Sequence, residues 1–250
     1  GITILGAGAT ANVVQGNFIG TANDGATDLG NATDGVLIDA APGNLIGGPT
    51  SGARNVISGN DRGIRLTGAG ATGNILSGNF IGLTLNGVDP LGNSLDGVRV
   101  EGGAINNVVG GDTSPTGNLI AFNGQFGVVV DGPATTGDAV LSNRIFSNGG
   151  AGIRLQNGGN LNQPAPTLTT AFSSESTLTT SISGVLTAAP NSAYRIQFFT
   201  NPITSSAIQG QGTNLLGDTV VRTDAAGIAP ISFSITPQIA LGTVISSTAT

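Results

Sequence analysis

Apolar and polar positions alternate in short segments that recur along the first part of the chain. Each segment opens with Gly, carries aliphatic residues at its second and fourth positions, and varies at its third. The six copies are Gly1-Ile-Thr-Ile4, Gly35-Val-Leu-Ile38, Gly63-Ile-Arg-Leu66, Gly97-Val-Arg-Val100, Gly127-Val-Val-Val130 and Gly152-Ile-Arg-Leu155. A period of two is typical of a strand with one buried face. The pattern therefore predicts six short strands.

Two further short elements follow each of the first five copies. The second element is Asn or Asp followed by two apolar residues, at Asn12, Asn44, Asn74, Asn107 and Asp138. The third is Asn-x-Ile, at Asn17, Asn55, Asn79, Asn118 and Asn143. The middle residue of the third element ranges from Phe18 to Arg144, whereas the Ile is constant. We therefore expect the Ile to face the core and its neighbour, including Val56, to face outward.

The three elements form a repeat of 25 to 34 residues, and a longer repeat of 62 to 64 residues spans two of these units. Within the longer repeat, residues 12–20 match residues 74–82, including Asn-Phe-Ile-Gly. Elements this short, bounded by Gly and Asn, argue against helical solenoids. We predict an all-β fold with a right-handed parallel β-helix of about five to six coils over residues 1–160. Stacked coils would align the Asn residues into side-chain ladders.

The repeat stops after Asn160, and residues 161–166 read as a Pro-containing linker. Residues 167–250 contain alternating Thr- and Ser-rich runs separated by turn signals, which is typical of a small antiparallel β-sandwich. The predicted strands are Leu178–Leu186, Tyr194–Thr200, Thr219–Thr223, Ile231–Ile235 and Val244–Thr248.

The Gly-aliphatic-x-aliphatic and Asn-x-Ile elements resemble those of parallel β-helix repeat proteins, the pectin-lyase-like superfold. Two-coil units with Asn-Phe-Ile-Gly and a Leu-Gly-Asn loop are similar to those of large secreted or surface-anchored bacterial proteins. The segment 167–250 resembles immunoglobulin-like or fibronectin-like modules, without a Cys…Trp…Cys signature. The resemblance implies an extracellular or bacterial cell-surface location. It implies no single activity, because this superfold includes lyases, hydrolases and adhesins.

Composition excludes several classes of function. The net charge is −6, and all eight cations are Arg. No basic cluster supports nucleic-acid binding, and no apolar stretch is long enough for membrane insertion. The chain has no His and no Cys, so Ser-His-Asp and Cys-His catalysis and His-ligated zinc sites are excluded.

Carboxylates and arginines remain for carbohydrate chemistry. The third position of the first element holds Arg65 and Arg99, and the fifth position holds Glu101 and Asp131. These four are the candidate glycan-contact residues, because Arg can bind the carboxylates or sulfates of an anionic sugar. The alternative is a surface ladder of ion pairs. Polygalacturonase-like relatives use a His, which this chain lacks. Pectate-lyase-like relatives use a calcium-binding cluster of carboxylates with an Arg or Lys base, and Arg65 or Arg99 beside Glu101 and Asp131 resembles that cluster only loosely.

Acidic loops raise the question of calcium. Asp24, Asp28, Asn31 and Asp34 in one loop correspond to Asn86, Asp89, Asn93 and Asp96 in another. When the two loops are aligned, they share an acidic residue only at Asp34 and Asp96. Their Leu-Gly-Asn segments, Leu29–Asn31 and Leu91–Asn93, match fully. The pattern favours turn geometry over calcium binding, and we predict no metal site or other cofactor.

We expect a non-catalytic structural or adhesive module, with a carbohydrate-active enzyme or polysaccharide-binding domain as the alternative. A β-helix needs cover at its ends. Nothing in the sequence provides it before Gly1, so we expect either further coils upstream or self-association. The candidate self-association residues are Ile2, Phe18, Leu37 and Phe80. Between monomer and homodimer, the sequence favours the homodimer.

Overall fold

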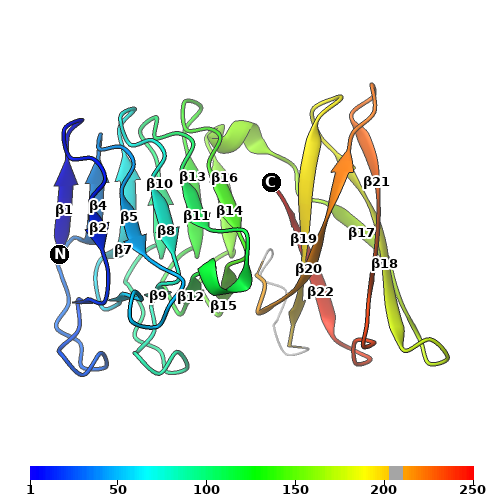
Figure 1. Cartoon of the computed structure of the whole chain (residues 1–250), viewed down its shortest axis with the longest axis horizontal. Coiled ribbons are helices and arrows are strands. Elements are labelled where there is room, and N and C mark those ends of the chain that lie inside the picture. The colour runs from blue at the N-terminus through cyan, green and yellow to red at the C-terminus, as the bar shows by residue number, and fades with distance from the viewer. Residues whose placement is uncertain (203–210) are drawn as a thin grey trace. The chain divides into compact units, whose positions relative to one another are not determined.

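The computed structural model describes residues 1–202 and 211–250, which form two compact units, Gly1–Asn162 and Gln163–Thr250. The boundary between the units lies inside the segment expected as a linker. The first unit is a parallel β-helix and the second a small β-sandwich, so the predicted fold class is confirmed (Figure 1).

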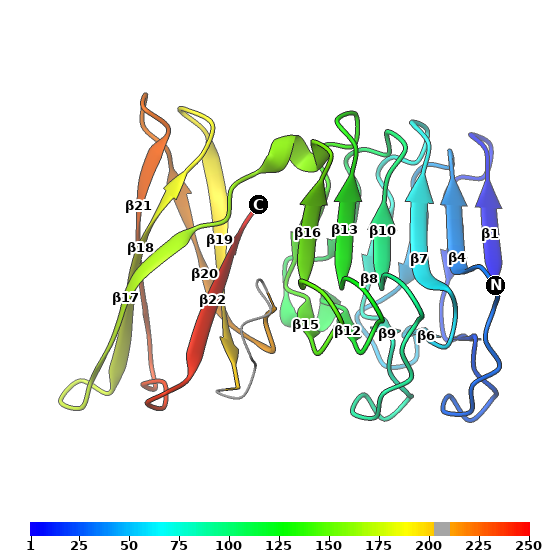
Figure 2. The same cartoon turned by 180° about the vertical axis from the view of Figure 1, so that it is seen from behind.

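Three parallel sheets run along the β-helix, and each coil contributes one strand to each sheet (Figure 2). The first sheet contains β1 (Ile2–Leu5), β4 (Asp34–Asp39), β7 (Arg62–Thr67), β10 (Val98–Val100), β13 (Val128–Asp131) and β16 (Ile153–Gln156). The second contains β2 (Val13–Val14), β5 (Leu45–Gly47), β8 (Ile75–Ser77), β11 (Val108–Gly110) and β14 (Ala139–Leu141). The third contains β3 (Phe18–Ile19), β6 (Val56–Ile57), β9 (Phe80–Ile81), β12 (Leu119–Ala121) and β15 (Arg144–Phe146). Five coils are complete, and β16 begins a sixth.

The register of the first sheet follows the repeat. Val36 pairs with Ile64, Ile64 with Val98, and Val98 with Val128, so aliphatic residues stack on aliphatic residues. These side chains, together with the Ile of each third element, form one continuous core. The predicted inward position of that Ile is confirmed, since Ile57, Ile81 and Ile120 are fully buried. Burial of such side chains is the main source of stability.

Asparagine side chains connect the coils at three corners. In each ladder the Nδ2 of one Asn donates to the Oδ1 of the Asn in the next coil, over 2.6 to 3.1 Å. The ladders that begin at Asn12 and Asn17 were predicted and are confirmed. A third ladder runs through Asn31, Asn60, Asn93, Asn123 and Asn148. Two short 3-10 helices, η1 (Ser114–Thr116) and η2 (Gly159–Asn162), complete the unit.

The outward residues of the third sheet are less exposed than predicted. Phe18 is 37% exposed, but Val56, which stacks between Phe18 and Phe80, is fully buried. Leu119 is also buried, in a small cluster with Leu83 and Ala121. The expectation that Val56 faces solvent is therefore wrong, because neighbouring side chains cover the outer face of this short strand.

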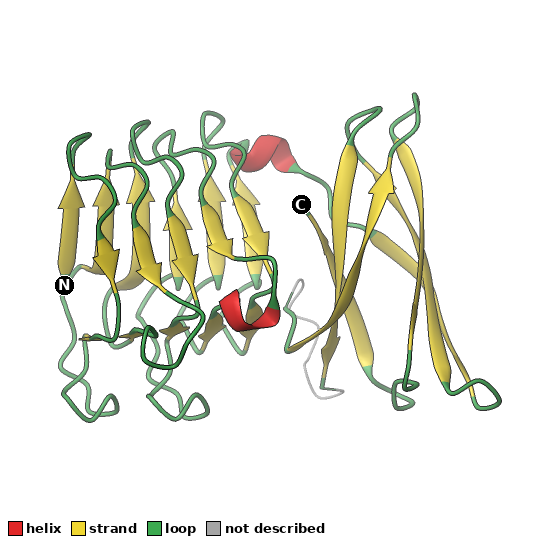
Figure 3. Cartoon of the chain, viewed as in Figure 1, coloured by secondary structure: helices red, strands yellow, loops and turns green. Residues whose placement is uncertain are grey.

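Two loops with the same backbone arrangement project from the same side of the β-helix (Figure 3). We call residues 20–30 and 82–92 the paired loops. Each closes with matching backbone bonds, Leu29 N–H to Gly20 O and Leu91 N–H to Gly82 O, both 3.0 Å. The amide of Leu85 donates to the carbonyl of Gly25 over 2.8 Å and joins one loop to the other.

Each loop rests on the Phe of its own coil. A Cβ added at Gly25 would lie 3.1 Å from the Phe18 ring, and one at Gly87 would lie 2.8 Å from the Phe80 ring. Both glycines have positive φ, +63° and +71°, which suits Gly. The Asn-Phe-Ile-Gly motif of the two-coil repeat thus provides a platform for the loop that follows it.

The second unit contains two three-stranded antiparallel sheets. One is formed by β17 (Thr167–Ser174), β18 (Thr179–Thr187) and β21 (Ile228–Ile235), the other by β20 (Asn214–Arg222), β19 (Ala193–Asn201) and β22 (Val244–Ala249). Phe198 and Phe233 stack between the sheets with ring centroids 4.5 Å apart. The sequence missed β17 and placed the start of β20 at Thr219, five residues late.

Candidate functional site

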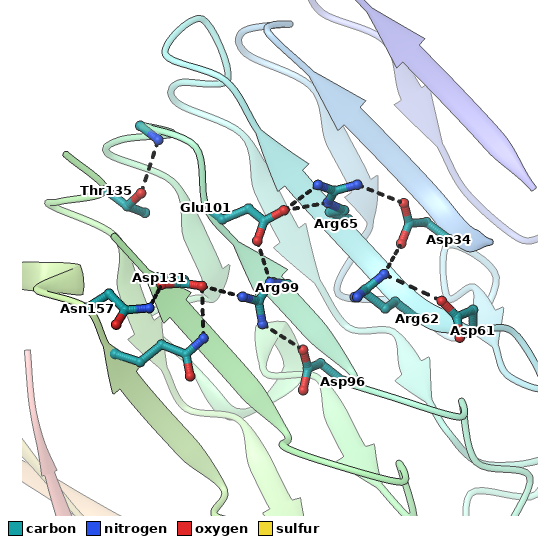
Figure 4. A network of polar contacts seen from close by, with 12 residues as sticks. Asp34, Asp61, Arg62, Arg65, Asp96, Arg99, Glu101, Asp131, Thr135 and Asn157 are labelled. Carbon is teal, nitrogen blue, oxygen red and sulfur yellow. Dashed lines mark hydrogen bonds and ion pairs between the residues drawn. The ribbon is translucent and has the colours of Figure 1, made fainter. Parts of the chain in front are cut away.

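The outward columns of the first sheet have the predicted register. Arg65 stacks on Arg99, and Arg99 on Val129, which is followed by Arg154. In the next column Asp131 lies beside Gln156. The structure brings Arg65, Arg99, Glu101 and Asp131 together in one network of ion pairs (Figure 4). We call this network, with its further partners described below, the charged strip.

Arg99 lies at the centre of the charged strip. Its guanidinium contacts Asp96 at 3.1 Å, Glu101 at 2.5 Å, and Asp131. Arg65 also contacts Glu101, so one carboxylate joins two stacked arginines. This arrangement offsets the repulsion between like charges on neighbouring strands.

The charged strip extends in both directions. Toward the N-terminus, Asp34 lies 3.9 Å from Arg65 and 3.8 Å from Arg62, which in turn lies 3.5 Å from Asp61. Toward the C-terminus, Asp131 accepts hydrogen bonds of 2.8 Å from the side-chain amides of Gln156 and Asn157. The contacts thus connect five successive strands of the first sheet, from β4 to β16.

Electrostatic interactions favour the charged forms of Arg99, Glu101 and Asp131 at the centre of the charged strip. Burial opposes ionisation of Glu101, but hydrogen bonds from Arg99 and Arg65 outweigh it and lower the pKa of the carboxyl group. Burial alone would lower the pKa of Arg99, yet its bonds to Glu101 and Asp96 raise it. The pKa of Asp131 is lowered against a burial effect by bonds from Gln156 and Asn157. Burial raises the pKa of Asp34.

Sequence reasoning missed the part that Asp34 and Asp96 play in the strip and placed both in possible calcium loops. Both are buried and pair with arginines of the first sheet. A signal was present, because Asp34, Arg62 and Asp96 each directly precede the Gly that opens a first element, with alternating charge. That alternation predicts pairing along the sheet.

Two of the other loop residues considered for calcium, Asp24 and Asn86, serve local turns. Asp24 accepts hydrogen bonds from the Ala26 and Thr27 amides and the Thr27 hydroxyl, and these bonds lower its pKa to about 2. In the second paired loop, Asn86 Oδ1 accepts bonds from Val88 and Asp89. Within residues 1–202 and 211–250, no group of three or more Asp, Glu, His or Cys side chains is arranged to hold a metal ion.

The four candidate self-association residues lie in different places. Phe18 and Phe80 are on the outer face of the third sheet, and the Arg54 guanidinium covers the Phe80 ring at 4.0 Å. Leu37 is a half-buried residue of the first sheet, and Ile2 packs against the core of the first coil. The structure does not bring them to one surface.

One arginine of the first sheet stands apart from the charged strip. Arg154 is exposed, and its guanidinium lies 6.0 Å from the Phe126 ring centroid. The pair places a cation beside an aromatic ring near the C-terminal end of the sheet.

No protein-family model matches the chain, and no curated protein matches it. Within the described part of the chain, no helix is long and apolar enough to cross a membrane.

Proposed function

We propose that this chain is a non-catalytic structural or adhesive module of a secreted or cell-surface bacterial protein. The supporting observation is that the charged strip pairs its own carboxylates and arginines across neighbouring coils. These groups hold the coils to one another, which suits a rigid spacer that presents its loops and its second unit.

A lyase-like mechanism needs a group that accepts a proton near neutral pH. Arg99 would be the base in such a mechanism, but its pKa is raised and its guanidinium bonds to three carboxylates. Glu101 and Asp131, with lowered pKa values, are weaker bases than ordinary carboxylates. The chemistry of the strip therefore supports a structural role over elimination.

The repeat pattern supports assigning the β-helix to the pectin-lyase-like superfold and the second unit to the immunoglobulin-like or fibronectin-like modules. Proteins with such repeats and modules are commonly secreted or surface-anchored. We extend that location to this chain as part of the proposal.

Polysaccharide binding is the second candidate, and the exposed Arg154 beside Phe126 favours it. A cation next to an aromatic ring can contact an anionic sugar. The contact would lie near the C-terminal end of the first sheet, since the central arginines of the charged strip are already paired.

A glycan array and a lyase assay test the proposal. We expect no unsaturated product from pectate, alginate or glycosaminoglycans. Product that disappears in Arg99→Ala, with the fold intact by circular dichroism, would refute the non-catalytic role. Array binding that is lost in Arg154→Ala and kept in Arg222→Ala, an exposed arginine of the second unit, would establish the polysaccharide-binding candidate.

A further inference from the structure

Asn is followed directly by Gly at four places in the chain, Asn86, Asn123, Asn148 and Asn157. Such a pair can convert the side-chain amide to a carboxylate without an enzyme, because the Gly backbone nitrogen can attack Cγ of the Asn. Gly has no side chain to hinder the attack, and its backbone rotates freely. The attack also needs an unbonded Gly amide and an Asn side chain that can turn toward it. The fold therefore decides which of the four pairs reacts.

Two of these pairs lie in the third Asn ladder. Asn123 and Asn148 are 1% and 2% exposed, and Asn123 Nδ2 donates to Asn148 Oδ1 over 2.9 Å. The following glycines are bonded as well: the amide of Gly124 donates to Asn93 O over 2.8 Å, and that of Gly149 to Asn123 O over 2.9 Å. Both the attacking nitrogen and its target are held, so we expect these pairs to be unreactive in the folded chain.

The third pair, Asn86-Gly87, lies in the second paired loop. Asn86 is exposed, but its Oδ1 accepts bonds of 2.8 to 3.0 Å from the Thr84 hydroxyl and the amides of Val88 and Asp89. Its Nδ2 donates to Asp89 Oδ2 over 2.6 Å. The amide of Gly87 donates to the carbonyl of Thr84 over 3.0 Å. Exposure alone therefore does not release this pair for reaction.

The fourth pair, Asn157-Gly158, is held much less. Asn157 is exposed and directly follows β16 (Figure 4). Within residues 1–202 and 211–250, its side chain makes one hydrogen bond, from Nδ2 to Asp131 Oδ1 over 2.8 Å. In the same part of the chain, the amide of Gly158 has no hydrogen-bond acceptor. Asn157-Gly158 thus combines an exposed side chain with an attacking nitrogen that is free.

The earlier coils show that the turn at Asn157 needs no side chain. Asn157 has a left-handed backbone, φ +51°, and directly follows the fifth position of the last first element. The residues at the equivalent position also have positive φ, and they are Gly6, Ala40, Gly68, Gly102 and Gly132. Gly adopts this conformation without steric cost. Replacing Asn157 by Gly should therefore keep the turn and remove the reacting group.

We propose that Asn157 is a self-modification site of the folded chain, at which the Gly158 nitrogen attacks Asn157 Cγ and forms a succinimide ring. The Gly158 nitrogen gives up its proton as the N–Cγ bond forms. The Cγ–Nδ2 bond breaks, and Nδ2 takes up a proton and leaves as ammonia. Water then opens the ring at either carbonyl and leaves aspartate or isoaspartate. Water is the co-reactant, and no group is oxidised or reduced.

The product would change the C-terminal end of the charged strip. A carboxylate would replace the amide that donates to Asp131, so Asp131 would lose this bond and gain a like charge beside it. Asp131 would keep its 2.8 Å bond from Gln156 and its contact with Arg99. The centre of the strip stays paired, and the modification adds one negative charge at its edge. This inference goes beyond the proposed structural role and does not depend on it.

Incubation in mildly alkaline buffer, with and without urea, tests the proposal. Peptide mapping by mass spectrometry measures conversion at each of the four pairs and separates the aspartate and isoaspartate products. In urea, where the fold no longer protects any pair, we expect comparable rates at all four. In the folded chain we expect Asn157 to convert at least about tenfold faster than the other three, the factor for one hydrogen bond of roughly 1.4 kcal/mol.

Asn157→Gly is the matched control. Ion-exchange chromatography should show that the folded parent chain gains negative charge with time and that the folded variant does not. In urea the variant should still convert at Asn86, Asn123 and Asn148. Conversion of folded Asn86 as fast as Asn157, or an intact Asn157 in a folded chain whose urea-treated form converts there, would overturn the proposal. Lyase and glycan assays do not affect these readouts, so the inference and the proposed function can fail separately.

Discussion

Replacing Asp138 by Asn should stabilise the β-helix at neutral pH. Asp138 occupies a position that is Asn in the other coils of the first ladder. Its Oδ1 accepts bonds of 2.9 Å from both the amide and the Nδ2 of Asn107. Its Oδ2 is buried and finds no hydrogen-bond partner among residues 1–202 and 211–250. A carboxylate therefore stands where the repeat provides an amide donor.

The repeat shows what that donor would contact. Asn74 Nδ2 donates to Ala41 O and Asn107 Nδ2 to Ala71 O, over 3.1 and 3.0 Å. By the same pattern, the Nδ2 of an Asn at position 138 would donate to the carbonyl of Ala104. A buried acceptor without a donor costs about 1–3 kcal/mol. We expect Asp138→Asn to raise the free energy of unfolding by roughly that amount at neutral pH.

The gain should depend on pH in a defined direction. Burial raises the pKa of Asp138 above its usual value of 3.8. A carboxyl group with a raised pKa in the folded state binds its proton more tightly there than in the unfolded chain, so its stabilising contribution falls as pH rises through that window. Below the usual pKa, protonated Asp138 can itself donate a hydrogen bond. The advantage of Asn should be small in acid and reach its full value above the raised pKa.

Urea unfolding at acidic and neutral pH, followed by circular dichroism, measures this difference. Hydrogen exchange at the Asn107 amide reports on the ladder itself. Asn74→Asp is the matched control, because it places a carboxylate in the same ladder and should destabilise the fold with the same pH dependence. An Asp138→Asn gain that is absent at neutral pH, or equal at both pH values, would refute the reasoning.

Four further substitutions test the packing and the charged strip. Arg99→Ala should cost roughly 3 kcal/mol in urea unfolding, because it removes the cation that Asp96, Glu101 and Asp131 share, although Glu101 keeps its contact with Arg65; a loss below about 1 kcal/mol, typical of surface pairs, would contradict this. Ile57→Ala should cost about 2–5 kcal/mol and Val56→Ala about 2 kcal/mol, since both are fully buried; a neutral Val56→Ala would restore the outward, exposed reading. Phe80→Ala should speed hydrogen exchange in residues 82–92 more than in residues 20–30, and equal effects would show that Phe80 does not support its own loop.

Much of the β-helix could be predicted because its signal is local and repeated. The Gly-aliphatic-x-aliphatic segments specify strands whose faces alternate, and equal spacing then specifies which residues stack. The sequence alone therefore predicts that Arg65 and Arg99 lie beside each other. The third ladder was missed because its spacing is irregular: Asn31 and Asn93 precede the following Gly by four residues, but Asn60 precedes it by three.

The predictions that proved wrong concern residues whose surroundings are formed by distant parts of the chain. Val56 reads as an outward residue from its own strand, and nothing nearby in the sequence shows that the side chains on either side of it in the column bury it completely. The role of Asp34 likewise depends on Arg62 and Arg65 of the next strand in the sheet. In the sandwich, strands without a repeat could be located only approximately, and β17 was missed.

The two-coil period follows from the width of the paired loops. Each loop has two arms joined by an antiparallel bridge, Thr21 to Asp28 in the first and Leu83 to Pro90 in the second. Two paired arms are about 4.8 Å apart, which is also the rise of one coil, so a loop with its side chains needs the space of about two coils. Loops in every coil would collide, whereas loops in alternate coils meet at the hydrogen bond from Leu85 N–H to Gly25 O. The Phe platforms occur at the same interval, and Val56 and Leu119 take their place in the coils between. The 62-residue repeat is thus the smallest unit after which the core, the ladders and the loops all recur in the same arrangement.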